Sequence, residues 1–139
     1  NAIRKKMLNR LTDLGIKQTV VQHQKAIVSE FASIGLSTLI GPGAIVNALS
    51  NIGQGCIINS GAIVEHECTI GDYTHIAPGA VLAGNVSVGE NSFIGANSVV
   101  KQGVKIGKNV TVGAGSVVIG NIPDGEIWVG NPAQKMKSK

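Results

Sequence analysis

The sequence has few aromatic residues and no long apolar run. Of its 139 residues 43% are hydrophobic but only 3% are aromatic, and these are Phe31, Tyr73, Phe93 and Trp128. A sandwich, barrel or dinucleotide-binding core of this size normally uses more large rings. Although the mean hydropathy is positive at +0.24, no run approaches the roughly 18 apolar residues that span a bilayer. We therefore expect no membrane insertion and a core of small aliphatic side chains.

Cysteine is also scarce. Cys56 and Cys68 form no CxxC motif, so the disulfide framework of small secreted proteins is not expected. No secretory signal with a small-residue cleavage site opens the sequence. We predict two buried, inert thiols and a cytoplasmic protein.

Positive charge is concentrated at the ends of the chain. Residues 28–118 hold three lysines against five acidic residues, whereas the rest holds nine basic residues against three acidic ones. The basic ends carry no interleaved aromatics for base stacking, so the composition does not favour nucleic-acid binding.

A repeat of six residues runs through most of the sequence. Every sixth residue from Val28 to Val118 is Ile, Val or Leu, without exception. The next position is often glycine, as at Gly35, Gly41 and Gly53, and the fifth position of each hexad is small or valine. This period fits neither an α-helix nor an alternating strand.

The hexads predict an all-β fold, a parallel β-helix with three short strands in each 18-residue coil. The aliphatic residue points inward, the small residue leaves room for it, and glycine and polar residues turn the corners. Stacked coils pair at about 4.8 Å, so about five coils make a column roughly 25 Å tall. The period does not decide its handedness, and right-handed crossovers are the general rule.

The two ends differ from the repeat. Residues 1–14 predict a helix with an apolar stripe and Gly15 at its end, and residues 16–21 predict a strand. We interpret residues 1–22 as the end of a preceding α/β domain and residues 23–123 as the β-helix. Residues 124–139 would hold a strand at 127–129, a short closing helix from Asn131-Pro132 and a basic tail.

Stacking at 18 residues identifies a first candidate site. His66 would lie between Ala48 and Gly84, which leave it open to a ligand, and Glu67 follows it directly. A carboxylate beside an imidazole holds one tautomer, which suits a general base. The same residues are also compatible with a plain polar corner.

Other candidates each have an ordinary structural alternative. The N–H of Gly84 could donate to a carbonyl oxygen that gains charge, or Gly84 could simply turn a corner. Asn59 could contact a substrate or only tolerate a left-handed backbone. Lys101, Lys105 and Lys108 could meet cofactor phosphates or be solvated.

We expect no metal. His66 and His75 are nine residues apart, half a coil, and cannot share an ion within one subunit. The three histidines could form a zinc site only across subunits.

Two segments carry a resemblance to a known family. They are INSGAIVEHECTIGD at 58–72, continued by HIAPGAVLAGNV at 75–86, and VGNPA at 129–133. With the hexads, they resemble the NeuD/PglD-type sialic-acid and amino-sugar acetyltransferases of the hexapeptide-repeat superfamily, over about residues 1–135. The resemblance implies a left-handed β-helix, a homotrimer and an N-terminal Rossmann-like domain that holds the sugar nucleotide.

The resemblance also implies roles for individual residues. His66 would be the general base, oriented by Glu67, and Gly84 would offer its N–H to the thioester carbonyl. His75 would contact acetyl-CoA, which would lie between two columns, and Asn59 would contact the acceptor sugar.

The expected activity is transfer of an acetyl group from acetyl-CoA to an amino or hydroxyl group of a nucleotide-activated amino sugar or sialic acid. Direct attack is expected because no activated serine or cysteine is evident. Two alternatives remain open: a non-catalytic trimeric β-helix, and a γ-class carbonic anhydrase, which needs three imidazoles on one zinc ion.

Overall fold

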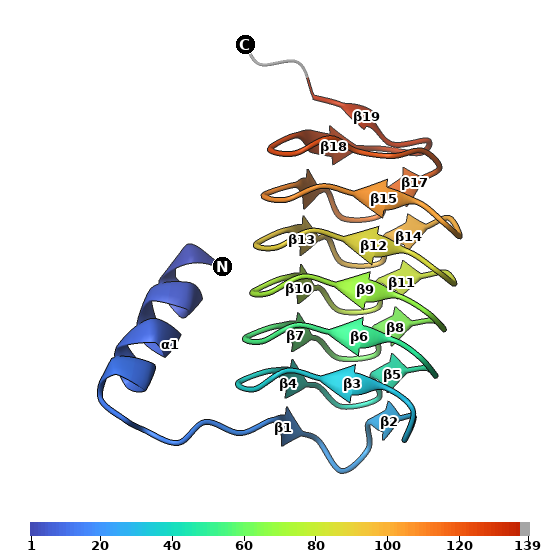
Figure 1. The fold of residues 1–139 in the computed structure, drawn as a ribbon. Helices are drawn as coiled ribbons and strands as arrows, with labels where there is room; N and C mark the ends of the chain where they lie inside the picture. The colour runs from blue at the N-terminus through green and yellow to red at the C-terminus, as the bar shows by residue number, and fades with distance from the viewer. Residues whose placement is uncertain (137–139) are drawn as a thin grey trace.

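The computed structural model describes residues 1–136 and shows a three-sided column of short strands with one helix beside it (Figure 1). The helix is α1 (Ala2–Asp13). The first face of the column is the sheet β1 (Val21–Gln22), β4 (Leu39–Ile40), β7 (Ile57–Ile58), β10 (His75–Ile76), β13 (Phe93–Ile94), β16 (Thr111–Val112), β18 (Ile127–Val129) and β19 (Gln134–Lys135).

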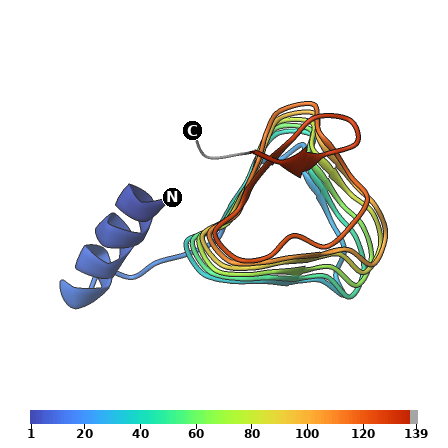
Figure 2. The ribbon, with the colours of Figure 1, turned by 90° about the horizontal axis from the view of Figure 1, so that it is seen from above.

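The other two faces are shorter sheets. The second face is β2 (Ile27–Val28), β5 (Ile45–Val46), β8 (Ile63–Val64), β11 (Val81–Leu82), β14 (Val99–Val100) and β17 (Val117–Val118). The third face is β3 (Ser33–Ile34), β6 (Asn51–Ile52), β9 (Thr69–Ile70), β12 (Ser87–Val88) and β15 (Lys105–Ile106). Seen from above, the coils superpose as a triangle (Figure 2).

The pairing confirms the 18-residue coil. Ile57 lies opposite His75 on the first face, and Ile63 lies opposite Val81 on the second, in parallel register. The strands follow one another around the column in the sense of a left-handed parallel β-helix, as the resemblance implied.

The core is the predicted inward row of aliphatic side chains. From Ile40 to Val118 every hexad aliphatic is at most 3% exposed, and each such burial contributes roughly 1.5–3 kcal/mol. Val28 and Ile34 are only partly buried, because the first coil has no coil beneath it. Five of the six buried hydroxyls of the small row donate to backbone carbonyls; Ser50 Oγ, for example, donates to Glu65 O at 2.7 Å.

The two thiols lie in this small row, as expected. Cys56 and Cys68 are free and buried. Burial raises the pKa of Cys56 to about 11, and it also raises the pKa of Cys68. Both therefore stay protonated and unreactive near neutral pH.

The corners are turned by residues other than the glycines that first suggested them. From Ser37 to Gly115 every sixth residue has a left-handed backbone, with φ between 54° and 73°. Gly35 and the other glycines that directly follow an inward aliphatic residue are not in this set. They are needed for space instead: a Cβ on Gly35 would lie 2.5 Å from the backbone of the next coil.

Helix α1 ends where the sequence predicted. The N–H of Ile16 donates to Leu11 O and that of Gly15 to Thr12 O, and Gly15 has φ +68°. These are the two bonds of a Schellman motif. The strand expected over residues 16–21 is mostly absent, since only Val21 and Gln22 pair with a neighbouring strand.

The helix lies beside the corner between the third and first faces (Figures 1 and 2). Arg4 fixes it there: Nε donates to Gly55 O at 2.7 Å and Nη2 donates to Tyr73 O at 2.6 Å. Part of its apolar stripe faces solvent, with Ile3 80% and Leu14 64% exposed. Within residues 1–136 there is no helix that is long and apolar enough to cross a bilayer.

The prediction of a short closing helix from Asn131-Pro132 is wrong. A turn follows β18, and β19 pairs antiparallel with it. Lys135 forms an ion pair with Glu126 at 2.5 Å, which helps to hold β19 in place. The hexad phase ends after Val118, because Ile122 takes the inward place and Ile106 pairs with it after 16 rather than 18 residues. Residues 137–139 of the basic tail lie outside the described residues.

Candidate active site

The corner between the second and third faces holds three of the five predicted site residues. His66 and Glu67 follow β8, and Gly84 follows β11 one coil further along the column. The N–H of Asn85 donates to His66 O at 2.8 Å, and that of Glu67 donates to Ala48 O at 3.0 Å. The predicted stacking of Ala48, His66 and Gly84 is therefore confirmed.

His66 and Glu67 form a pair through the nearer ring nitrogen. His66 Nδ1 lies 3.0 Å from Glu67 Oε2, and the side chains are 52% and 57% exposed. An ionised carboxylate only accepts hydrogen bonds, so Nδ1 carries the proton. The lone pair of Nε2 is then left free to accept a proton. Glu67 reaches this position from a left-handed backbone, with φ +61°.

Gly84 provides the surface on which the His66 imidazole lies. A Cβ on Gly84 would lie 2.5 Å from both Cε1 and Nε2 of His66. Gly84 does not have a left-handed φ, so space rather than backbone conformation requires glycine. Within residues 1–136 the N–H of Gly84 makes no hydrogen bond, a property shared by the equivalent Ala48. Nε2 of the His66 imidazole thus lies close to the backbone of Gly84.

His75 and Asn59 form a second group on the first face and the corner beyond it. His75 belongs to β10 and Asn59 follows β7, and Asn59 Nδ2 lies 3.1 Å from His75 Nε2. The His75 ring meets that of Phe93 edge-on, with centroids 5.2 Å apart. Burial, and then the positive charges of Arg4 and the N-terminus, lower the pKa of His75. Asn59 does not have the left-handed backbone considered for it.

The five predicted residues thus form two groups that lie at different corners of one chain. The hexad spacing indicated this separation, but not the bond between Asn59 and His75, nor the approach of Arg4 from α1. Among the three candidate lysines, Lys108 pairs with Glu90 at 3.7 Å. Residues 1–136 contain no cluster of three or more His, Cys, Asp or Glu side chains that could hold a metal ion.

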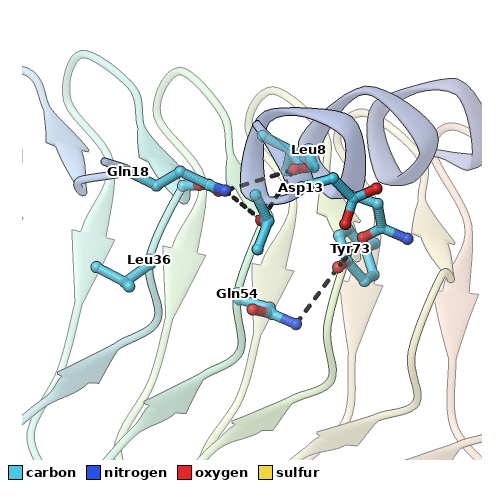
Figure 3. Close-up of a pocket in the computed structure, with 10 residues that line it drawn as sticks. Leu8, Asp13, Gln18, Leu36, Gln54 and Tyr73 are labelled. Carbon is cyan, nitrogen blue, oxygen red and sulfur yellow. Dashed lines mark hydrogen bonds between the residues drawn. The ribbon is translucent and has the colours of Figure 1, made fainter. Parts of the chain in front are cut away.

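A cavity of about 310 Å³ lies elsewhere, between α1 and the column. Figure 3 shows Gln18 bonded toward the helix and Gln54 bonded to Tyr73. Gln18 bonds Thr12 and Ser37, and Tyr73 bonds Gln54 and Asn9. Since most of these polar groups bond one another across the boundary between α1 and the column, we interpret the cavity as the seam along which the helix docks.

Comparison with protein families matches the repeat in two adjoining stretches. The bacterial transferase hexapeptide family (six repeats) matches residues 49–84, and the hexapeptide repeat of succinyl-transferase matches residues 85–119. The chain belongs to the hexapeptide-repeat transferases. The stretch 49–84 contains all five predicted site residues. No curated protein sequence matches the chain.

Solved structures match nearly the whole chain. The acetyltransferase domain of PglB from Neisseria gonorrhoeae is 40% identical with a TM-score of 0.95, over 97% of this chain. PerB from Caulobacter crescentus, solved with CoA and GDP-perosamine, is 39% identical with a TM-score of 0.97, over 99% of this chain. WeeI from Acinetobacter baumannii is 32% identical with a TM-score of 0.94, over 97% of this chain.

These matches confirm the resemblance to the NeuD/PglD-type transferases. The chain spans 66% of the length of each of these three structures.

Proposed function

We propose that this hexapeptide-repeat transferase moves the acetyl group of acetyl-CoA to the amino group of a nucleotide-linked sugar. The observation that carries the proposal is the pairing of His66 with Glu67 against the backbone of Gly84. The similar PglB domain has been solved with acetyl-CoA, and PerB with CoA and GDP-perosamine. Two further structures of the Caulobacter enzyme replace a single histidine, by alanine or by asparagine.

The chemistry follows from the free lone pair on His66. The amine of the acceptor attacks the thioester carbon and forms the new C–N bond, while His66 Nε2 takes the proton that the amine loses. Glu67 accepts the hydrogen bond from Nδ1 and stabilises the imidazolium that results. General-base help of this kind contributes about 10²–10⁴ in rate.

Gly84 complements the base. Charge grows on the thioester oxygen as the amine attacks, and a backbone N–H fixed nearby stabilises that charge. When the C–S bond breaks, the CoA thiolate leaves and takes a proton, so the products are an N-acetylated sugar and CoA.

We also propose that the active unit is a homotrimer. A three-sided column can pack a corner of one copy against a face of the next and close under threefold symmetry. Such packing would bring the His66 corner of one copy to the His75 group of another. Light scattering should give about three times the 14.3 kDa mass of the chain, and a stable monomer would contradict this arrangement.

The activity is tested by incubating the protein with acetyl-CoA and a panel of nucleotide-linked amino sugars, GDP-perosamine among them. Sialic acid and a nucleotide sugar without an amine complete the panel. We expect CoA release together with a product heavier by one acetyl group, only with amine acceptors. If only sialic acid is acetylated, the acceptor group is a hydroxyl and the proposed transfer to an amine is wrong. CoA release without any acetylated sugar would overturn it.

A further inference from the structure

The amide of Asn59 has a fixed orientation. The backbone N–H of Ser60 donates to Asn59 Oδ1 at 2.8 Å, so this side of the amide is the oxygen. The other side, 3.1 Å from His75 Nε2, is therefore the nitrogen. An amide nitrogen only donates, so Nε2 of His75 must accept and cannot carry a proton. The neutral ring then holds its proton on Nδ1.

The other ring nitrogen of His75 is left for a ligand. Within residues 1–136 no hydrogen bond is made by Nδ1, and this atom is not among the fully buried polar atoms that lack a partner. The ring lies at a cavity of about 490 Å³, together with Arg4, Phe93, Asn109 and Thr111. The half-buried His75 side chain thus lines this open space, and its Nδ1–H has no other partner among the described residues.

The surroundings also keep the ring neutral. The strands on either side place Ile57 and Phe93 next to His75, and neither residue titrates. From α1, Arg4 and the N-terminal amino group add positive charge, and with burial they lower the pKa of the ring. Within residues 1–136 no carboxylate pairs with His75 in the way that Glu67 pairs with His66.

We propose that Asn59 is a positioning residue, which holds His75 as a neutral imidazole that directs its Nδ1–H at an oxygen atom of the bound ligand. Resting on the proposed function, we assign that oxygen to a carbonyl of acetyl-CoA, in the thioester or in the amides of its pantetheine arm. The assignment adds to the expectation that Asn59 contacts the acceptor sugar, because these two bonds use the amide oxygen and only one of the two N–H donors.

The tautomer is measured directly by ¹⁵N NMR of the protein labelled at histidine, in wild type and in Asn59→Asp and Asn59→Ala. The aspartate keeps an oxygen for the Ser60 N–H but turns a second acceptor toward Nε2. In wild type we expect His75 protonated on Nδ1 and titrating below its ordinary range. In Asn59→Asp we expect the proton on Nε2 and a raised pKa. His23 and His66 serve as internal controls that should not change.

Binding of acetyl-CoA alone, measured by calorimetry across pH, gives the second readout. In the Asn59→Asp variant, a neutral His75 ring turns the lone pair of its Nδ1 toward the ligand oxygen. The affinity for acetyl-CoA should therefore fall about tenfold near pH 8. It should recover at lower pH, where the imidazolium regains its Nδ1–H. Wild type should lack this pH-dependent gain, and Asn59→Ala should lose affinity at every pH.

The outcomes separate the inference from the proposed function. A wild-type His75 protonated on Nε2, or a tautomer that Asn59→Asp leaves unchanged, would overturn the role of Asn59. A pH profile of acetyl-CoA affinity that is the same in both proteins would overturn the assignment of the ligand oxygen. If the tautomer behaves as expected but no sugar is acetylated, the proposed function fails and the positioning role stands.

Discussion

The two histidine groups of the column differ in which end of the imidazole they leave free. At the His66 corner a carboxylate accepts from Nδ1 and leaves a lone pair on Nε2. On the first face an amide donates to Nε2 of His75 and leaves an N–H on Nδ1. The same side chain thus offers a lone pair in one place and an N–H in the other, and we propose that they act as a base and as a donor. The chemistry of a single neighbour decides between the two.

The largest expected effect comes from removing the base. His66→Ala should lower kcat for acetyl transfer by about 10²–10⁴ and change KM for acetyl-CoA little. Steady-state kinetics with the acceptor found in the panel check this. His23→Ala, outside the hexads, is the matched control and should leave both constants unchanged. An His66→Ala variant as active as wild type would exclude the base.

Gly84→Ala tests how closely the imidazole must lie on the backbone. The new Cβ would fall 2.5 Å from His66 Nε2, so the ring must move, and kcat should fall about 10²-fold because displacements near 1 Å cost that much. Gly120→Ala is the control at the same corner, since nothing lies within 4 Å of its Cβ. Equal activity of the two variants would mean that the contact does not matter.

Mixing two inactive variants tests whether the two groups act together across a subunit boundary. If His66 of one copy works with His75 of the next, random trimers of His66→Ala and His75→Ala should regain about a quarter of the wild-type sites. The measurement is kcat after co-expression of the two chains in equal amounts. Activity no higher than the mean of the two separate variants would place both groups in one subunit or make His75 dispensable.

The smallest effect concerns the backbone that carries the carboxylate. Glu67 has φ +61°, which costs about 1–2 kcal/mol for a residue with a side chain. Glu67→Gly should therefore keep or raise the free energy of unfolding, by up to about 1 kcal/mol, while activity falls. In Glu65→Gly, where φ is not left-handed, unfolding should become easier by about 0.5–1 kcal/mol. Denaturant titrations compare them, and a loss of stability in Glu67→Gly would contradict the argument.

The column could be predicted because its core depends on one repeated physical requirement. Each inward position must be aliphatic and each neighbouring slot small, so Ile40, Val64 and Leu82 could be placed without any structure. The stacking of His66 under Gly84 followed from the same 18-residue spacing. The phase break before Ile122 was visible as the end of the hexads.

The features that could not be predicted from the sequence depend on contacts that the repeat does not determine. The bond from Asn59 to His75 is diagonal, 16 residues apart, and its meaning rests on which way the amide points. The docking of Arg4 on Tyr73 joins segments with unrelated patterns. Asn131-Pro132 suits a helix start and a turn equally well, so only the pairing of β19 with β18 decided between them.

The most direct test of the account is a crystal structure of the protein with acetyl-CoA. We expect the thioester oxygen within hydrogen-bond distance of the Gly84 N–H, with the carbonyl carbon facing the side on which His66 Nε2 lies. An acetyl group bound away from this corner, with His66 Nε2 facing solvent alone, would contradict it.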